Sequence, residues 1–269
     1  MTRMMSQALG GFAAFCAGAL VGWAAPAHSQ EHDDVNAANN PLTPKITLNF
    51  QNYFTPDLVG LPDKRANQFL LRGLVPADFF GQPQLLRYTL PISTVPQFPS
   101  GYETGLGDLT LIDLLLFPGK DLSIGAGPLL VLPTATDQSL GAGKWQAGIA
   151  GVVVAPQSWG LLGALSTYQA SFAGHDDRAD VSIATFQPIV NYNLADGFYL
   201  RSTATMSYNF ENDSYFVPVG FGIGKVFKVD EKTTLNAYVE PQYTVFNEGY
   251  GNPRWQILAG INVQFSLGE

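Results

Sequence analysis

The sequence offers few side chains of the kinds that catalyse reactions or bind metal ions. Beyond its N-terminal targeting segment it keeps two histidines, His32 and His175, and no cysteine. Two histidines so far apart lack the spacing of a metal site. A serine hydrolase needs a histidine beside its nucleophile, oriented by a polar group; His175 offers such a base, although loop histidines are usually solvated. We therefore predict no enzyme activity and no catalytic, cofactor-binding or metal-binding residue.

A short acidic cluster follows His175 and comprises Asp176, Asp177 and Asp180. Carboxylate oxygens are ligands of divalent cations, so this outer-loop cluster is a candidate for binding a cation, or for linking lipopolysaccharide through one. The alternative is a solvated loop, which is the commoner role of a run of acidic residues.

Charged side chains within alternating segments are more informative. Arg72, Arg87, Arg201 and Glu240 occupy the polar positions of their segments, and we place Asp113 there too. In a membrane barrel such positions face the lumen, because a cationic side chain on the lipid face costs roughly 2 to 4 kcal/mol at the midplane. Two interpretations stay open. These residues form a charged constriction that selects solutes, or they form internal arginine–carboxylate pairs that fill a narrow barrel and close it.

In the segments that carry these charges, apolar and polar residues alternate with a period of two, which predicts strands. The last segment shows the pattern most clearly, with apolar Trp255, Ile257, Ala259, Ile261, Val263, Phe265 and Leu267 separated by mostly small or polar residues. We predict about twelve strands, near residues 45–54, 67–75, 84–94, 107–118, 121–133, 143–155, 160–172, 181–193, 197–210, 215–228, 233–246 and 254–267.

Alternation alone also fits a soluble sheet with one wet face, but three features favour an all-β, up-and-down, antiparallel transmembrane barrel. The polar positions carry mainly small uncharged side chains, which suit a shared, water-lined interior. The connections alternate between short and long, as in outer-membrane barrels, except that 76–83 is longer than expected. Aromatic residues lie near segment ends, as membrane girdles require; they include Trp145, Tyr192, Phe198, Tyr208, Phe210, Phe216, Tyr243, Phe246 and Trp255.

Composition and charge exclude two further classes of protein, and the N-terminal residues indicate export. The 269 residues are 46% hydrophobic and 13% charged, with a net charge of -8, so the chain is neither a disordered protein nor a binder of nucleic acid. Residues 1–29 read as a secretory signal peptide that contains Cys16, the only cysteine. Residues 30–44 lack a periodic apolar face and are predicted to be a flexible periplasmic leader, followed by the barrel over 45–269. We expect export to a bacterial outer membrane.

Four short motifs resemble a known family. They are Gly105-Leu106-Gly107-Asp108-Leu109-Thr110, Leu132-Pro133-Thr134-Ala135-Thr136-Asp137, Leu140-Gly141-Ala142-Gly143-Lys144-Trp145, and the run from Ser171 to Val181. Over about residues 105–269 the chain resembles a Proteobacterial outer-membrane barrel family described as transporters. That family is often mislabelled neuromedin U, and it is related to barrels associated with phenol meta-pathway degradation. The resemblance implies a transport role, with hydrophobic or aromatic solutes suggested by genomic association, and no catalytic residues.

The expected function is therefore a passive pore for small solutes in the outer membrane. Expected partners are outer-membrane lipid and lipopolysaccharide, the barrel-assembly machinery and the solute; no cofactor is expected. One alternative is a closed structural or interaction barrel of the envelope. Another is an outer-membrane lipid hydrolase, which can also have twelve strands and would depend on His175.

Overall fold

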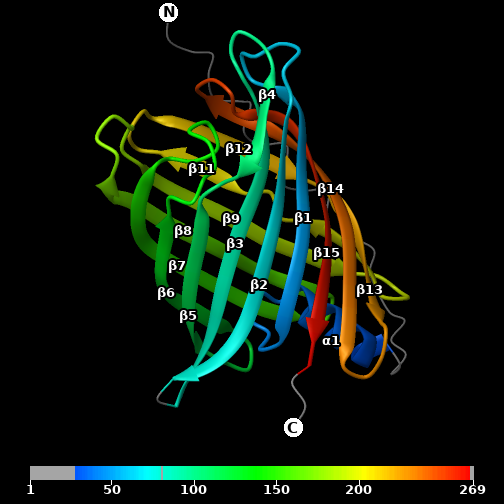
Figure 1. Ribbon diagram of the computed structural model, residues 1–269. Helices are drawn as coiled ribbons and strands as arrows, with labels where there is room; N and C mark the ends of the chain where they lie inside the picture. Colours follow the sequence, from blue (N-terminus) through cyan, green and yellow to red (C-terminus); the bar gives the residue numbers. More distant parts are fainter. Residues whose placement is uncertain (1–27, 80, 267–269) are drawn as a thin grey trace, which may run out of the picture.

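The computed structural model describes residues 28–79 and 81–266, which form one helix and a closed antiparallel β-barrel (Figure 1). The helix is α1 (His28–Asn39). The strands within these residues are β1 (Ile46–Leu58), β2 (Ala66–Phe79), β3 (Gln82–Pro96), β4 (Tyr102–Leu106), β5 (Leu109–Phe117), β6 (Ser123–Leu132), β7 (Lys144–Gln157), β8 (Gly160–Gly174), β9 (Ser182–Asn193), β10 (Phe198–Ser202), β11 (Met206–Asn209), β12 (Ser214–Gly220), β13 (Gly222–Lys228), β14 (Thr233–Glu248) and β15 (Pro253–Phe265).

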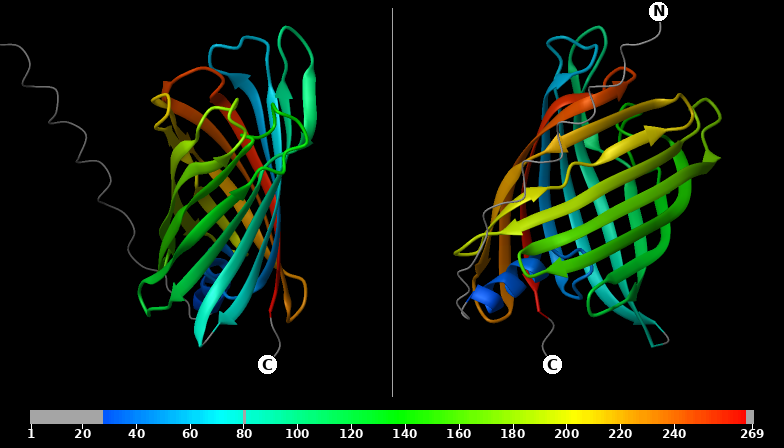
Figure 2. Two further views of the ribbon diagram at one scale, coloured as in Figure 1. Left: turned by 60° about the vertical axis from the view of Figure 1, so that its left-hand side comes forward. Right: turned by 180° about the vertical axis from the view of Figure 1, so that it is seen from behind.

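These fifteen strands of the described residues make twelve barrel staves, because three staves are each divided in two. The divided staves are β4 with β5, β10 with β11, and β12 with β13. Neighbouring staves pair in sequence order, and β15 closes the barrel by pairing with both β1 and β14. The views in Figure 2 show the strands running around a common axis. The predicted fold class and strand number are confirmed.

The two ends of the barrel differ, and we name them by their connections. The loop end carries residues 59–65, 97–101, 133–143, 175–181, 210–213 and 249–252, whereas the turn end carries the other connections and the end of β15. Two connections depart from prediction. The connection at 76–83 is a tight turn, because β2 continues to Phe79 and β3 starts at Gln82. Residues 95–106, predicted as a loop, extend the β3–β4 hairpin with Thr94 and Thr104 hydrogen-bonded across it.

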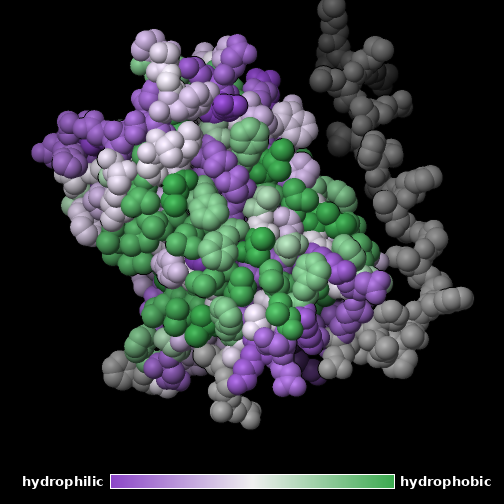
Figure 3. Space-filling model, turned by 45° about the vertical axis from the view of Figure 1, so that its right-hand side comes forward, coloured by the Kyte–Doolittle hydropathy of each residue, from purple (hydrophilic) through white to green (hydrophobic). Residues whose placement is uncertain are grey.

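Apolar side chains cover the middle of the outer wall, and hydrophilic residues lie at both ends (Figure 3). Aromatic pairs mark the edges of this belt. Trp159 stacks on Tyr192 at the turn end, with ring centroids 5.9 Å apart, and Tyr243 contacts Trp255 at the loop end, at 4.8 Å. The predicted girdle is wrong at Phe216, whose side chain lines an internal cavity instead. No helix in the described part of the chain has the length and hydropathy needed to cross a membrane.

The predicted leader has a defined structure rather than a flexible one. The predicted signal peptide lies outside the described residues except for His28 and Ser29, the first residues of α1, and α1 sits in the mouth of the barrel at the turn end (Figure 1). Val35 and Ala38 are buried against Tyr199 and Val226 of the inner wall. The sequence could not show this, because α1 is held by few apolar residues.

The inner wall has an apolar half and a polar half. The apolar half comes mainly from the staves between β2 and β9 and packs against Leu42 of the leader. Its buried members within the described residues are Leu42, Leu74, Leu85, Ile112, Leu114, Leu116, Leu129, Val131, Ala150, Val152, Val154, Leu161 and Ile189. The polar half faces it from β1, β14 and β15, where Gln51, Glu240 and Gln256 are buried.

Candidate functional site: a chamber in the lumen

A chamber of about 130 Å³ lies inside the barrel where the two halves of the inner wall meet. Arg72, Arg87 and Arg201 line it, so β2, β3 and β10 bring these three cations to one place. Leu74, Leu165 and Ile189 line the same chamber from the apolar half. Arg72 and Leu74 are two residues apart on β2, so the alternation of the strand puts both on the inner face. The chamber therefore presents cationic and apolar groups side by side.

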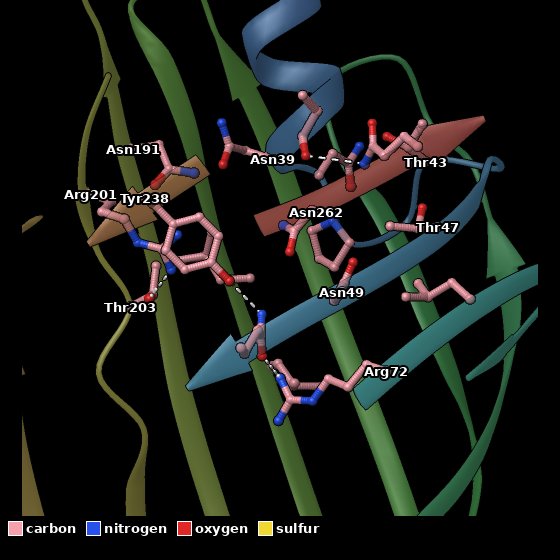
Figure 4. A pocket seen from close by; sticks show the side chains of 18 of the residues that line it. Asn39, Thr43, Thr47, Asn49, Arg72, Asn191, Arg201, Thr203, Tyr238 and Asn262 are labelled. Carbon is pink, nitrogen blue, oxygen red and sulfur yellow. Dashed lines mark hydrogen bonds between the residues drawn. The ribbon is translucent and has the colours of Figure 1, made fainter. Parts of the chain in front are cut away.

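Two of the arginines are joined through neutral side chains (Figure 4). The Nη1 atom of Arg72 donates to Oε1 of Gln51 at 2.5 Å, and Nε2 of Gln51 donates to the Tyr238 hydroxyl, also at 2.5 Å. The guanidinium of Arg201 lies over the Tyr238 ring, 3.7 Å from its centroid, in a cation–π contact. Tyr238 was not among the predicted site residues, although it occupies a polar position of its strand.

Glycine makes room for the Tyr238 ring. Gly260 faces Tyr238 across the β14–β15 pair, and a Cβ atom added to Gly260 would lie 2.5 Å from Cζ of the tyrosine. The absence of a side chain at this position lets the ring lie flat along the inner wall. Any larger residue there would push the ring into the chamber.

Glu240 neutralises Arg201. The Nε atom of Arg201 lies 2.8 Å from Oε2 of Glu240, and both side chains are at most 9% exposed. Thr203 donates to the same carboxylate from its backbone nitrogen and its hydroxyl, each at 2.8 Å, and Gln242 donates to it at 3.1 Å. Every oxygen of this buried carboxylate is thus occupied, as a buried charge requires.

Arg72 and Arg87 have no carboxylate within ion-pairing distance among the residues that the structure describes. Their Nε atoms are both buried without a hydrogen-bond partner in the same residues. The amide oxygens of Asn49, Asn191 and Asn262 are buried and unpartnered as well. Buried polar groups in proteins are normally satisfied, and the hydrogen bonds of these groups are not supplied by the described side chains.

A wider vestibule of about 360 Å³ lies toward the loop end, and Arg72 lines both cavities. Toward the turn end, the chamber is bounded by the leader residues Asn39, Asn40, Pro41 and Thr43. The leader is held there by polar contacts. Asn36 donates to the Gln157 carbonyl at 3.1 Å and accepts from Nδ2 of Asn193 at 2.9 Å, and the backbone of Gly197 donates to Glu31.

Asp113 does not belong to the chamber, which corrects its predicted position. Its neighbours Ile112 and Leu114 are buried in the apolar half of the lumen, so Asp113 faces outward with Leu111, which is 37% exposed. The amide nitrogen of Gln84, in the orientation that satisfies both groups, lies 3.0 and 3.1 Å from the two carboxylate oxygens of Asp113. The alternation of polar and apolar residues predicted the wrong face for Asp113, because β5 is apolar on both faces.

The acidic loop residues lie far from the chamber, in the exposed connection between β8 and β9. Asp180 accepts from Nζ of Lys144 at 3.1 Å and from Ser171 at 3.2 Å. These two bonds, that of Lys144 first, hold the pKa of the Asp180 carboxyl below its usual range. Asp176, Asp177 and His175 are exposed. Residues 28–79 and 81–266 contain no group of three or more His, Cys, Asp or Glu side chains placed to hold a metal ion.

The four motifs of the family resemblance meet at the loop end. Asp108 accepts from the backbone nitrogens of Ala135 and Ala142, at 3.1 and 2.7 Å, and so fastens both ends of the 133–143 loop. Arg178 donates to the carbonyls of Gln138, Gly141 and Ala142. The motifs therefore hold two loops together in the structure.

No family model matches the chain, and no curated protein matches its sequence. Solved structures do match. An outer-membrane channel from Pseudomonas putida F1 is 15% identical over 84% of this chain and 98% of that chain, with a TM-score of 0.64. The NanC porin is 11% identical over 82% of this chain and 100% of its own, with a TM-score of 0.50. Outer-membrane phospholipase A from Escherichia coli reaches only 0.40, at 12% identity over 88% and 98% of the two chains.

At these identities the likeness concerns the fold, and the family inferred from the motifs stays a prediction. The fold itself agrees with the strand order and closure of the barrel. The chain has the closed, twelve-stranded antiparallel fold of outer-membrane β-barrel proteins, a fold that it shares with a channel and a porin.

Proposed function

We propose that this protein is an outer-membrane pore through which small solutes pass passively. The observation that carries the proposal is the pair of cavities inside the barrel that share Arg72 in their walls, with a second unpaired arginine, Arg87, in the chamber. A barrel closed by internal ion pairs would match each cation to a carboxylate; Arg201 is matched in this way, whereas Arg72 and Arg87 have no carboxylate partner among the described residues. The apolar belt and aromatic edges of the outer wall support a place in a membrane.

The solutes are small, because the chamber has a volume of only about 130 Å³. Its apolar side, with Leu74, Leu165 and Ile189, is compatible with the hydrophobic or aromatic compounds that the family resemblance implies. In the orientation usual for these barrels, the loop end faces outward and the turn end faces the periplasm. Solutes would then enter through the vestibule and reach the leader last.

The second candidate is a closed structural or interaction barrel. The observation that favours it is the leader, whose residues Asn39 to Thr43 bound the chamber at the turn end. In that case the two loops fastened by Asp108 and Arg178 would be the part that meets partners. The lipid hydrolase is not proposed, because His175 is exposed on a loop.

Liposome swelling separates the two candidates. The refolded protein is reconstituted into liposomes, which are then placed in isosmotic solutions of neutral solutes of increasing size. A pore gives swelling rates that fall steeply as the solute grows, with a cut-off at small polyols and monosaccharides. A correctly inserted barrel, verified by heat-modifiable migration on a gel, that leaves every rate at the level of empty liposomes would favour the closed barrel.

A further inference from the structure

The balance of charge in the chamber points to an anion. Glu240 accepts from Arg201, Thr203 and Gln242, so its charge is used within its own network. Arg72 donates to the neutral Gln51, and no carboxylate of the described residues pairs with Arg87. Two uncompensated positive charges thus remain in the lumen of a chain whose net charge is -8.

The two arginines also have hydrogen bonds to give. Among the described residues, the two guanidinium groups give one hydrogen bond, from Nη1 of Arg72 to Gln51, and a guanidinium is a donor with no acceptor capacity. A carboxylate satisfies such donors in a planar, charge-assisted geometry. The unpartnered amide oxygens of Asn49 and Asn262 are neutral, so they do not cancel the two cations.

The apolar side of the chamber indicates the chemical character of the part of the ligand that does not contact the arginines. Leu74, Leu165 and Ile189 border the same space, and Leu74 and Ile189 continue into the buried apolar cluster of the wall. A fully hydrated inorganic anion would leave these side chains against water. A carboxylate with a compact apolar body would instead cover them and keep its charge on the arginines.

The volume limits the size of that body. The chamber measures about 130 Å³, close to the cavity of about 150 Å³ that takes up benzene in an engineered protein. Arg72 lines the vestibule as well, so a ligand arriving from the loop end meets this cation before it reaches Arg87 and the apolar side.

We propose that the chamber is a binding site for small organic carboxylates with a compact apolar body, held by Arg72 and Arg87. The proposal rests on the proposed pore for its transport role, since bound carboxylates would be the solutes that the pore favours. The binding itself needs only the folded barrel.

The test is calorimetric titration of the detergent-folded full mature chain with benzoate, compared with benzyl alcohol and benzylamine. These probes share a ring and differ in charge. We expect benzoate to bind about tenfold or more tightly than the alcohol, as charge-assisted hydrogen bonds predict, and the ammonium to bind least. Acetate, which lacks the apolar body, should bind more weakly than benzoate.

Substitutions of Arg72 and Arg87 test whether these two residues form the binding site. Arg87→Gln and Arg72→Gln should each weaken benzoate binding by about tenfold, while Arg87→Lys, which keeps the charge, should recover part of it. Arg254→Gln is the matched control, because Arg254 pairs with Asp57 outside the chamber and is about half exposed. Heat-modifiable migration shows which variants fold, and the lysine variant keeps the test decisive if a glutamine variant does not.

The outcomes distinguish the two proposals. Benzoate binding that depends on Arg87 in a protein that passes no solute would support the carboxylate site and overturn the pore. Solute passage together with equal affinity for benzoate and benzyl alcohol, or affinity unchanged in the Arg87 variants, would overturn the carboxylate site and leave the pore standing.

Discussion

At the residue scale, the three arginines of the chamber differ in their partners. Arg201 is paired with a carboxylate, whereas, within the residues that the structure describes, Arg72 and Arg87 are not. Arg201 can reach Glu240 because β13, which separates β10 from β14, has Gly222 opposite Arg201 and so no side chain between the two residues. Arg72 and Arg87 lie on β2 and β3, beside β5, whose inward residues Ile112 and Leu114 are apolar. Among the described residues, the lumen therefore holds the buried pair of Arg201 with Glu240 and two arginines without a carboxylate partner.

Removing the charge of Glu240 should destabilise the barrel. Glu240→Gln leaves Arg201 buried without its counter-charge, and breaking a buried pair from one side typically costs about 3 to 5 kcal/mol. The free energy of unfolding in urea, measured in detergent, reports this loss. Asp57→Asn is the matched control, because it breaks an exposed pair with Arg254 and should cost less than about 1 kcal/mol. Equal losses in both variants would contradict a buried, structural pair.

Filling the space beside Tyr238 should disturb the chamber. Gly260→Ala puts a methyl group into the ring of Tyr238, which should displace the ring from Arg201 and break its bond to Gln51. The expected results are a loss of about 1 to 3 kcal/mol in stability, as overpacking gives, and a weaker affinity for benzoate. Gly151→Ala, at an open position, should do neither. Unchanged stability in Gly260→Ala would show that the ring is not held against the wall.

At the element scale, the predictable parts of the structure are those where a strand has contrasting faces. Gln256 and Ile257 alternate as predicted, so β15 was placed within a few residues. On β5, Ile112 and Leu114 are as apolar as Leu111, so the sequence held no signal that Asp113 faces outward. The leader also escaped prediction, because α1 is positioned by hydrogen bonds such as that between Asn36 and Asn193 rather than by an apolar stripe. Pairings such as Arg201 with Glu240 depend on strand register, which alternation does not give.

The attachment of the 133–143 loop to the barrel should depend on the carboxylate of Asp108. Asp108→Ala removes the acceptor for the backbone nitrogens of Ala135 and Ala142, so both ends of the loop lose their attachment. Hydrogen–deuterium exchange should rise at least tenfold for amides of residues 133–143, with β14 unaffected. Asp137→Ala, which removes the two local bonds from the Ser139 backbone nitrogen and hydroxyl, is the control. Exchange that stays at the wild-type rate in Asp108→Ala would contradict the fastening role.

The attachment of the 175–181 loop should weaken in acid. Hydrogen bonds from Lys144 and Ser171 lower the pKa of Asp180, so the stabilisation is complete above the ordinary aspartate pKa of about 3.9 and is lost as the pH falls through the lowered value. The protection of the loop amides, which is their exchange rate relative to the intrinsic rate at each pH, should fall only in the acidic part of the range from pH 6 down to pH 3. Asp180→Asn should remove the dependence on pH; if the dependence persists in this variant, another group is responsible.

At the scale of the whole molecule, the barrel combines an apolar belt outside with a lumen divided into apolar and polar halves. The chamber sits where these halves meet, between the vestibule and the leader. Twelve strands lie between the eight that side chains fill and the sixteen that leave a wide channel. The leader bounds the chamber at the turn end, so in the proposed pore it would limit the width of the passage there.

Deleting residues 30–41 should widen that passage. The deletion removes most of α1 and the bounding residues Asn39, Asn40 and Pro41, but leaves Thr43 and β1 in place. We expect faster liposome swelling and a larger solute cut-off than in the full mature chain. Asn36→Ala together with Asn193→Ala, which loosens the leader without removing it, should have a smaller effect in the same direction. Identical swelling in all three proteins would mean that the leader does not obstruct the passage.

The most direct test of a passive pore lined by unpaired arginines is the current through single molecules of the refolded mature protein in a planar bilayer. We predict discrete conductance steps and a reversal potential, in a gradient of potassium chloride, that favours chloride over potassium. The double variant Arg72→Gln, Arg87→Gln should keep the steps and lose most of the preference for chloride. An inserted, folded barrel that passes no current, or one whose ion preference is the same in the double variant, would contradict this account.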